Sequence, residues 1–512
     1  MNANLYAAIE AAGCNRGDGA FIETDEGRVF SRADAAAESA RLANLLLALG
    51  ARRGDRIAVQ VEKSPESLFL YLACLRAGLV YLPLNTAYQR GELAYFVADA
   101  EPRVIVCHPR TVELMQELSA GVAEVLSLDE HGQGSLTQKA AGHGPEFSTV
   151  ESKADDLAVI IYTSGTTGRS KGAMVTHGNL ESNARTLVEY WKFSQDDVLL
   201  HALPIFHVHG LFVANHCALF SGAKLLWHRK FDAQRVLRDL PRATVMMGVP
   251  TFYTRLLAEA AFTRELAKGV RLFISGSAPL LADTFGEFHQ RTGQYILERY
   301  GMSETCMNTS NPLEGERRAG SVGFPLPGVS VRITGDQDRI LPQGEIGAIQ
   351  VKGENVFNGY WRMPERTREE FTADGWFRTG DVGLFDDHGY LCISGRAKDL
   401  IISGGFNVYP KEIEMALDAM PGVAESAVIG VPHPDFGEAV AAVVVPRKGA
   451  RLDPSAIIAE LKKNLANFKV PKQVYLVDDL PRNAMGKVQK AELRGRYRNV
   501  SGDPNALGKR KA

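Results

Sequence analysis

The sequence predicts an α/β protein with a large N-terminal domain of layered α/β sheets and a small α+β C-terminal domain. Helical and strand patterns alternate from the start of the chain, which is typical of parallel sheets covered by helices. From about Ser330 the pattern changes to short alternating segments separated by turn residues, as in antiparallel hairpins. We expect the N-terminal domain to cover 1–396 and the C-terminal domain 397–500, with a tail over 501–512.

The first elements follow from helix caps and apolar runs. Ser31 begins a capping box with Asp34, and the Ala- and Leu-rich helix after it should run to Gly50, a natural C-cap. Ser64, followed by proline, should open a second helix that continues through Leu79. Buried strands are expected at Arg56–Val61, Val80–Leu84 and Arg103–His108.

The middle of the chain continues the same alternation. Residues 131–155 are rich in glycine, serine and charge and lack periodicity, so we expect a surface connection there. Leu157–Thr163 is a strongly apolar strand that runs directly into a Gly/Thr/Ser loop. Further strands are expected at Val198–Leu203, Lys224–Trp227, Thr244–Val249 and Leu272–Ser275. The C-terminal domain should mix strands such as Ala427–Val431 and Ala441–Val445 with a helix over Pro454–Leu465.

Composition argues against several classes of function. The 512 residues carry 58 Lys and Arg against 60 Asp and Glu, a formal net charge of −2, so no nucleic-acid partner is expected. The six cysteines show no CxxC spacing, so neither a zinc knuckle nor a redox motif is expected. The N-terminus lacks the pattern of a secretion signal, and no window is apolar enough to span a membrane. We therefore expect a cytoplasmic protein that has no membrane partner.

The most informative segment is the loop after the Leu157–Thr163 strand, which has the sequence YTSGTTGRSKG from Tyr162. Its glycines let backbone N–H groups converge, and its hydroxyls and Lys171 add donors and positive charge. An anionic phosphate chain requires such a cradle. The loop does not fit the Walker A pattern. A Ser/Thr/Gly-rich surface loop is the alternative interpretation of this segment taken alone.

Five further motifs favour the phosphate interpretation. They are YGMSET from Tyr300, FRTGD ending at Asp381, GRAKD from Gly395, SGGFN from Ser403 and PRNAMGK ending at Lys487. Together with the loop they occur in order over most of the chain and resemble the signatures of the adenylate-forming, or acyl-activating, superfamily. The resemblance implies ATP, Mg²⁺ and coenzyme A as cofactors or substrates. It also implies a β-barrel-like part in the N-terminal domain and a mobile C-terminal domain.

The resemblance further implies a nucleotide site. Glu304 supplies a hard oxygen ligand and should hold Mg²⁺ near the phosphates together with Thr166. Tyr300 should pack against adenine, Asp381 should bind the ribose, and Arg396 should contact ribose or phosphate. Taken alone, Glu304 fits a surface residue and Asp381 a turn residue equally well. The nucleotide-binding residues expected in full are Thr163, Ser164, Gly165, Thr166, Thr167, Gly168, Lys171, Ser277, Tyr300, Gly301, Met302, Ser303, Asp381 and Arg396.

We expect Lys487 to be catalytic, together with Glu304 and His207. A lysine is a compact point charge that can stabilise charge developing at the carboxylate and the α-phosphate. A solvated tail lysine is the alternative, and the resemblance of LPRNAMGK to the family's catalytic-lysine motif disfavours it. By the same resemblance, a protein lysine acetyltransferase would inactivate Lys487 by removing its charge, and a deacetylase would restore it.

Two other positions are implied by the motion of the C-terminal domain in the family. Lys398 occupies the hinge position between the orientation for adenylation and the one for thioester formation. Gly404 and Gly405 resemble the glycine pair that faces the pantetheine tunnel of CoA. For Lys398 the alternative is a lysine on a surface loop.

The acyl pocket should include three residues that lie far apart in the sequence. His207 resembles the family's gate near the reacting carboxylate, and Ser277 should contact both substrate and nucleotide. Arg255 should lie on the helix that follows Pro250. There it either binds a second, distal carboxylate bidentately or pairs with Glu259 on the surface.

Two long stretches, one from Val80 and one from Glu298, look close to malonyl-CoA synthetases. In that group an arginine at the position matching Arg255 recognises the malonate carboxylate. The resemblance implies that a small dicarboxylate, malonate or methylmalonate, reacts with ATP and CoA through an acyl-adenylate. The products would be acyl-CoA, AMP and pyrophosphate. The alternatives are a short-chain or aryl monocarboxylate–CoA ligase, an adenylation enzyme that loads a carrier protein, and a non-catalytic nucleotide-binding protein.

Overall fold

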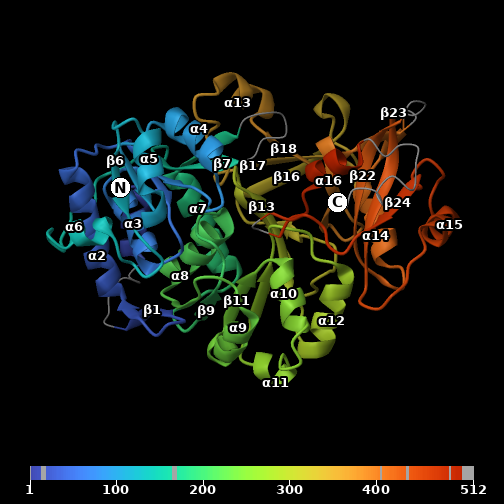
Figure 1. The fold of residues 1–512 in the computed structure, drawn as a ribbon, viewed down its shortest axis with the longest axis horizontal. Coiled ribbons are helices and arrows are strands. Elements are labelled where there is room, and N and C mark those ends of the chain that lie inside the picture. Colours follow the sequence, from blue (N-terminus) through green and yellow to red (C-terminus); the bar gives the residue numbers. More distant parts are fainter. Residues whose placement is uncertain are drawn as a thin grey trace, which may run out of the picture.

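A computed structural model describes residues 2–12, 19–163, 170–403, 406–433, 437–483 and 486–498. Its first large sheet has six strands in the order β6-β5-β3-β4-β7-β8, parallel except for the β7–β8 hairpin (Figure 1). The strands are β3 (Arg56–Gln60), β4 (Val80–Pro83), β5 (Val104–Cys107), β6 (Glu124–Ser127), β7 (Leu157–Thr163) and β8 (Lys171–Thr176).

The second large sheet has nine strands in the order β15-β14-β13-β12-β11-β9-β10-β1-β2. Its centre is parallel, and an antiparallel partner is added at each edge. The strands are β1 (Ala20–Thr24), β2 (Val29–Ser31), β9 (Val198–His201), β10 (Lys224–Trp227), β11 (Val245–Gly248), β12 (Leu272–Ser275), β13 (Leu297–Met302), β14 (Cys306–Ser310) and β15 (Phe324–Pro325).

Helices lie between these two sheets and outside them. In α3 (Pro65–Arg76) every residue from Ser67 onward is buried, and α3 shares the largest hydrophobic core with both sheets. A helix that is buried on every side lies inside a layered core. The same core takes up α8 (Asn215–Ser221) and the π-helix His209–Ala214 before it. The other helices here are α1 (Leu5–Ala11), α2 (Arg32–Ala48), α4 (Arg90–Ala100), α5 (Val112–Leu118), α6 (Ser135–Ala140), α7 (His177–Tyr190), α9 (Ala233–Asp239), α10 (Pro250–Leu257), α11 (Arg264–Ala267) and α12 (Ala282–Thr292).

Two smaller sheets complete the chain, so the α/β class and the large-plus-small architecture are confirmed. The part expected to resemble a barrel is an antiparallel sheet in the order β16-β17-β18-β19. The C-terminal sheet has the order β21-β20-β23-β22, with β24 paired to β23. These strands are β16 (Val329–Thr334), β17 (Gly347–Gly353), β18 (Phe377–Phe385), β19 (Leu391–Arg396), β20 (Ile401–Ser403), β21 (Phe406–Val408), β22 (Val423–His433), β23 (Gly437–Pro446) and β24 (Gln473–Leu476). The accompanying helices are α13 (Pro364–Glu370), α14 (Pro410–Asp418), α15 (Pro454–Asn464) and α16 (Lys490–Tyr497).

Local predictions differ from the structure at two places. The capping box of Ser31 and Asp34 is present, but the helix opened by Ser64 ends at Arg76 rather than at Leu79. It ends there because Gly78 adopts a φ of +67°, which no helix continues. The expected surface connection over 131–155 contains a short helix, α6, which the glycine-rich composition concealed.

The C-terminal domain lies against the N-terminal domain beside α10 and α12 (Figure 1). An ion pair of 2.6 Å joins Arg447, after β23, to Asp283 in the first turn of α12. Gly486 approaches α10 so closely that a Cβ there would lie 3.0 Å from the hydroxyl of Thr251. In the described part of the chain, no helix is both long and apolar enough to cross a membrane.

Candidate active site

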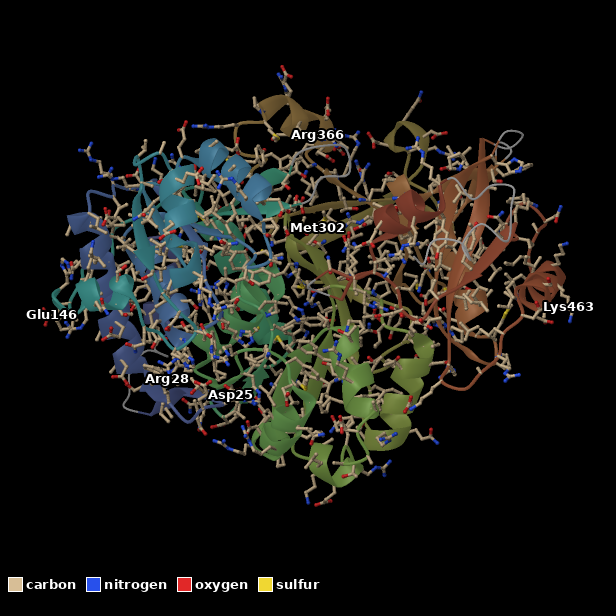
Figure 2. The ribbon with its side chains drawn as sticks, viewed as in Figure 1. Asp25, Arg28, Glu146, Met302, Arg366 and Lys463 are labelled. Carbon is tan, nitrogen blue, oxygen red and sulfur yellow. The ribbon has the colours of Figure 1, made fainter. Side chains whose placement is uncertain are left out.

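The predicted site residues gather where the strands of the nine-stranded sheet end and the C-terminal domain begins. In open α/β sheets ligands bind beyond the carboxyl ends of the parallel strands. Here β12 leads into Ser277, β13 carries Tyr300 and Met302, and β11 leads into α10. Met302 lies near the middle of the view in Figure 2, between the N-terminal sheets and the C-terminal domain.

Three residues expected at the nucleotide form one polar chain. The hydroxyl of Tyr300 donates to Asp381 at 2.5 Å, and Asp381 forms an ion pair of 3.0 Å with Arg396. Burial and the Asp381 carboxylate together raise the pKa of Tyr300 well above its ordinary value. The three residues come from β13, β18 and β19, so this chain joins the nine-stranded sheet to the antiparallel sheet.

Glu304 lies close to the end of β7, which leads into the glycine-rich segment 164–170, the predicted phosphate loop. It is buried, and its Oε1 accepts hydrogen bonds from Thr163 at 3.4 Å and from Tyr360 at 3.2 Å. Burial raises the pKa of Glu304, while the positive charges of Lys171 and Arg396 oppose that rise. A buried carboxylate with hydroxyl neighbours and free oxygen capacity fits a hard cation such as Mg²⁺.

Lys171 begins β8, immediately after the phosphate loop. It forms an ion pair of 3.2 Å with Glu370 of α13, and its ammonium lies 4.2 Å from the ring centroid of Tyr360. The expected loop residues Ser164, Gly165, Thr166, Thr167 and Gly168 lie outside the described residues, as do Gly404 and Gly405.

Gly301 is required by the close approach of two strands. A Cβ at this position would lie 1.8 Å from the carbonyl oxygen of Cys306 on β14. Only glycine allows β13 and β14 to meet this tightly between Tyr300 and Met302. Ser303 follows in the turn before Glu304 and is half-buried.

The expected acyl region contains two histidines held in place by local contacts. His207 Nδ1 accepts a hydrogen bond from the backbone N–H of His209 at 3.3 Å. His209 Nδ1 lies 3.2 Å from Ser277 Oγ, and Ser277 has a φ of +71°, unusual for a residue with a Cβ. Burial, with the nearby charges of Arg299 and Lys487, lowers the pKa of His207 to about 4. His207 is therefore a neutral side chain at physiological pH.

Arg299 is a residue of this region that sequence reasoning missed. It is 3% exposed, and a Cβ on Gly276 would lie 2.4 Å from its guanidinium carbon. Among the described residues, none forms a hydrogen bond or ion pair with this guanidinium, and its Nε and one terminal nitrogen are buried without a partner. Burial lowers the pKa of Arg299 to about 9. The preceding residue Glu298 forms no ion pair with it, since consecutive strand residues point to opposite faces, although its charge partly opposes the lowering of the pKa.

Arg255 lies on α10, as predicted, and is exposed. It forms no ion pair with any described residue, and Glu259, its expected surface partner, accepts instead from Gln234 at 2.7 Å. Arg255 follows Thr251 by four residues, so the two share a helix face. Thr251 contacts Gly486 next to Lys487, which places that face toward the loop of Lys487, called the lysine loop below.

Lys487 lies in a tight turn of the C-terminal domain that reaches the N-terminal domain. Its backbone N–H donates to Asn483 Oδ1 at 3.0 Å. The residue is exposed, yet protein atoms surround its ammonium group; these atoms and the charge of Arg396 lower the pKa of Lys487 to about 8. Lys398 lies between β19 and β20, and neighbouring protein atoms and Arg396 likewise lower its pKa.

Comparison with known proteins places the chain in a family. A model of AMP-binding enzymes matches residues 10–361, and a model of the AMP-binding enzyme C-terminal domain matches 412–487. The chain belongs to the AMP-binding enzymes, and thus to the adenylate-forming superfamily.

Individual relatives refine this assignment. ATP-bound MatB from Rhodopseudomonas palustris is 56% identical, with a TM-score of 0.95 over 98% of this chain and 100% of that chain. The apo form of the same protein gives a TM-score of 0.84 over the same shares. A malonate–CoA ligase of Arabidopsis thaliana is 35% identical over 88% of this chain and 79% of that protein. A feruloyl-CoA synthase of an Amycolatopsis species is 38% identical over 92% and 94%. The chain is an AMP-forming acyl-CoA synthetase and resembles malonyl-CoA synthetases.

Proposed function

We propose that the chain is a malonate–CoA ligase that also accepts methylmalonate. A carboxylate oxygen of the acid attacks the α-phosphorus of ATP and pyrophosphate leaves, which gives the acyl-adenylate. The thiolate of CoA then attacks the acyl carbon and AMP leaves. The relatives with aryl substrates keep a monocarboxylate–CoA ligase as the second candidate. An enzyme that transfers the acyl group to a carrier protein is a third.

The buried guanidinium of Arg299 carries the malonate proposal. An arginine that is buried without a partner costs free energy, so a site that keeps one is built for an anionic ligand. A monocarboxylate directs its only charge at the α-phosphate, whereas malonate brings a second carboxylate a short distance away. The charge of Arg299 acts on both His207 and His209, so we propose that the second carboxylate binds near these three side chains. Arg255 has no ion-pair partner among the described residues and lies on the helix face that contacts the lysine loop, so it is proposed as a second cation for this carboxylate.

For the nucleotide we propose the roles predicted from the sequence. Tyr300 and Asp381 bind adenosine, Arg396 contacts ribose or phosphate, and Lys171 binds the polyphosphate. The other residues that the sequence predicts at the nucleotide are proposed to bind it as well. Glu304, with Thr166, would hold Mg²⁺, which supplies charge neutralisation at the phosphates when it is bound. Lys487 stabilises the negative charge that develops when the carboxylate attacks.

We further propose that the C-terminal domain begins at residue 397 and turns about Lys398 between the two half-reactions. Gly404 and Gly405 would then meet the pantetheine arm of CoA. Cytoplasmic location and control of Lys487 by an acetyltransferase and a deacetylase stay predictions. Each would follow from the general behaviour of the superfamily.

Pyrophosphate release with ATP and Mg²⁺ tests the proposal across acetate, malonate, methylmalonate, succinate, octanoate and benzoate. We expect malonate to lead. Arg299→Met should lower kcat/KM for malonate about a hundredfold, since one buried charge-assisted contact is lost. Arg255→Ala should lower it in the same direction, and acetate turnover should change little in both variants. If benzoate or octanoate were the preferred acid and both variants kept that preference, the malonate proposal would be rejected. Product analysis with CoA present separates thioester formation from carrier loading.

A further inference from the structure

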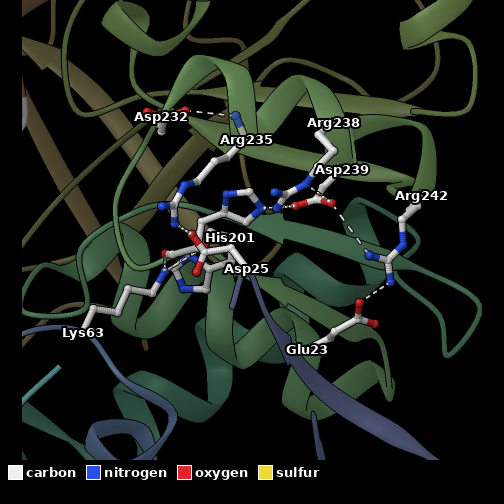
Figure 3. Close-up of polar contacts among 10 residues, drawn as sticks. Glu23, Asp25, Lys63, His201, Asp232, Arg235, Arg238, Asp239 and Arg242 are labelled. Carbon is white, nitrogen blue, oxygen red and sulfur yellow. Dashed lines mark hydrogen bonds and ion pairs between the residues drawn. The ribbon is translucent and has the colours of Figure 1, made fainter. Parts of the chain in front are cut away.

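A buried lysine lies outside the proposed site. Lys63, in the loop between β3 and α3, is 5% exposed. Its ammonium donates to the carbonyl oxygens of His201 at 2.7 Å and His228 at 2.9 Å, and lies 3.2 Å from His201 Nδ1. Figure 3 shows Lys63 pointing at His201, among the charged residues of β1 and α9.

No described carboxylate forms an ion pair with Lys63. The nearby Asp25 pairs with Arg235 at 2.6 Å, and Asp239 contacts Arg238 and His228 (Figure 3). Burial lowers the pKa of Lys63 well below its ordinary value. The three acceptors around the amine match the three hydrogens of the protonated form, which opposes that effect. The ammonium of Lys63, whose burial is unfavourable, is thus held at a defined position by these hydrogen bonds.

His201 connects Lys63 to the acyl region. Its Nε2 lies 3.2 Å from the carbonyl oxygen of Gly210. Because a carbonyl only accepts, Nε2 must carry the hydrogen, and the neutral ring then accepts from Lys63 at Nδ1. Lys63 therefore selects the tautomer of His201 that can bind Gly210.

Gly210 closes a loop that carries the acyl-region histidines. It lies in the first turn of the π-helix His209–Ala214, and a Cβ on it would be 2.1 Å from the carbonyl oxygen of Pro204. The segment from His201 to Gly210 is thus fastened at its base by the His201–Gly210 contact. His207 and His209 lie within it, and His209 reaches Ser277.

Lys63 also links the two large sheets. It follows β3 of the six-stranded sheet, whose strand β7 leads into the phosphate loop. Its carbonyl acceptors stand at the ends of β9 and β10 in the nine-stranded sheet. In the proposed site the residues for the acid follow the nine-stranded sheet, and the loop for the phosphates follows the six-stranded sheet. Their relative position decides the rate, because misplacement by about 1 Å can cost about a hundredfold.

We infer that Lys63 and His201 are positioning residues of the acyl pocket. Lys63 fixes the tautomer of His201, and His201 holds the loop that places His207 and His209 against the substrate carboxylate. The inference rests on the proposed role of this pocket.

The test is steady-state pyrophosphate release by wild type, Lys63→Met and the matched surface variant Lys268→Met. Methionine keeps the apolar stem and removes the donors. We expect Lys63→Met to raise KM for the preferred acid and lower its kcat/KM about tenfold to a hundredfold. KM for ATP should stay within about twofold, and preference for malonate over acetate should fall. Lys268→Met, on an exposed turn, should match wild type.

A merely structural role predicts another pattern. Loss of folded protein would lower kcat for every acid and leave acid KM and acid preference unchanged, and this result would overturn the inference. Wild type alone tests the proposed function: if it prefers an acid other than malonate, that proposal fails, and Lys63→Met is then judged with the preferred acid.

A second pair of variants applies even where Lys63→Met does not fold. In His201→Gln the amide nitrogen can reach the place of Nε2 and bind Gly210, whereas in His201→Asn it cannot. We expect His201→Asn to show the raised acid KM and His201→Gln to remain closer to wild type. Equal acid KM values for the two variants would overturn the inference.

Discussion

The charges of single residues prepare this site for anions before any ligand arrives. Arg299 and Lys487 are cations whose pKa values are lowered to about 9 and about 8 by surrounding protein and, for Lys487, by Arg396. Each is held at a cost that an incoming carboxylate or phosphate relieves. The free energy of ligand binding therefore includes the neutralisation of charges already in place.

The lowered pKa of Lys487 predicts a pH dependence. In the proposed role of Lys487 the protonated form stabilises negative charge, and this form is lost as the pH rises through the pKa of about 8. We expect kcat/KM for ATP in the adenylation reaction to fall above pH 8, because this parameter reports the free enzyme. Under saturating ATP the fall should move to higher pH, since bound phosphates stabilise the ammonium. His207, with a pKa of about 4, should add no inflection between pH 6 and 8. An ATP-independent fall would contradict this assignment.

Replacement of Lys487 should separate the two half-reactions. Lys487→Gln imitates acetylation, and we expect adenylation, measured as pyrophosphate exchange, to fall at least about a hundredfold. Thioester formation from a supplied acyl-adenylate should change far less. Lys463→Gln, on exposed α15 at the far end of the C-terminal domain (Figure 2), is the control and should keep both reactions. Full adenylation by Lys487→Gln would remove this lysine from the mechanism.

At the scale of elements, apolar runs bounded by turns were sufficient to predict strands. Lys224–Trp227 and Leu272–Ser275 are confirmed residue for residue, and Leu157–Thr163 forms β7. Short helices were harder, because α6 lies in a glycine-rich stretch and is stabilised by tertiary packing of Leu136 and Ala140. Elements with strong local patterns were predictable, whereas those that depend on distant contacts were not.

The same distinction applies to the site. Its motifs predicted Tyr300, Asp381 and Arg396, and the structure brings these three together. Arg299 was missed although it directly precedes Tyr300, because nothing in the local sequence shows that its guanidinium lacks a partner among the residues that the structure describes. That property depends on Gly276 and on the loop of His207, which lie elsewhere in the sequence.

Substitution by alanine should have opposite effects at two glycines, Gly301 in the β13–β14 hairpin and Gly286 in α12. Gly301→Ala would drive a Cβ into the Cys306 carbonyl, and we expect a loss of about 2 kcal/mol or more in the free energy of unfolding. Gly286→Ala lies inside α12 with no atom within 4 Å of the added Cβ. It should gain about 0.5–1 kcal/mol. Thermal unfolding with and without ATP measures the change in stability of both variants. An unchanged unfolding midpoint for Gly301→Ala would show that the hairpin backbone adjusts to the added Cβ.

For the whole molecule, the seating of the C-terminal domain is the central feature. The whole chain superposes better on the ATP-bound than on the apo form of MatB, with TM-scores of 0.95 and 0.84. The exposed Arg447–Asp283 pair adds little free energy by itself. The pair marks two positions that would move apart if the C-terminal domain turned as proposed.

A cross-link between these positions tests the proposed rotation. In a variant with Asp283→Cys and Arg447→Cys, a short bismaleimide should join the domains in the present orientation. We expect pyrophosphate exchange to persist and thioester formation to fall at least about tenfold, because rotation is blocked. The parent chain treated in the same way controls for its own cysteines, of which Cys74, Cys107, Cys217 and Cys306 are buried. Full thioester formation by the linked protein would show that no such rotation is needed.

The pair between Lys171 and Glu370 bears on how the enzyme discharges its products. If Lys171 binds the polyphosphate as proposed, the nucleotide must compete for it with Glu370, which also pairs with Arg366 at 2.7 Å. A triphosphate brings enough negative charge to win that competition, whereas AMP has no β- or γ-phosphate to offer. In the proposed mechanism Glu370 pairs with Lys171 again once pyrophosphate has left, so this ion pair would favour release of the product over its retention.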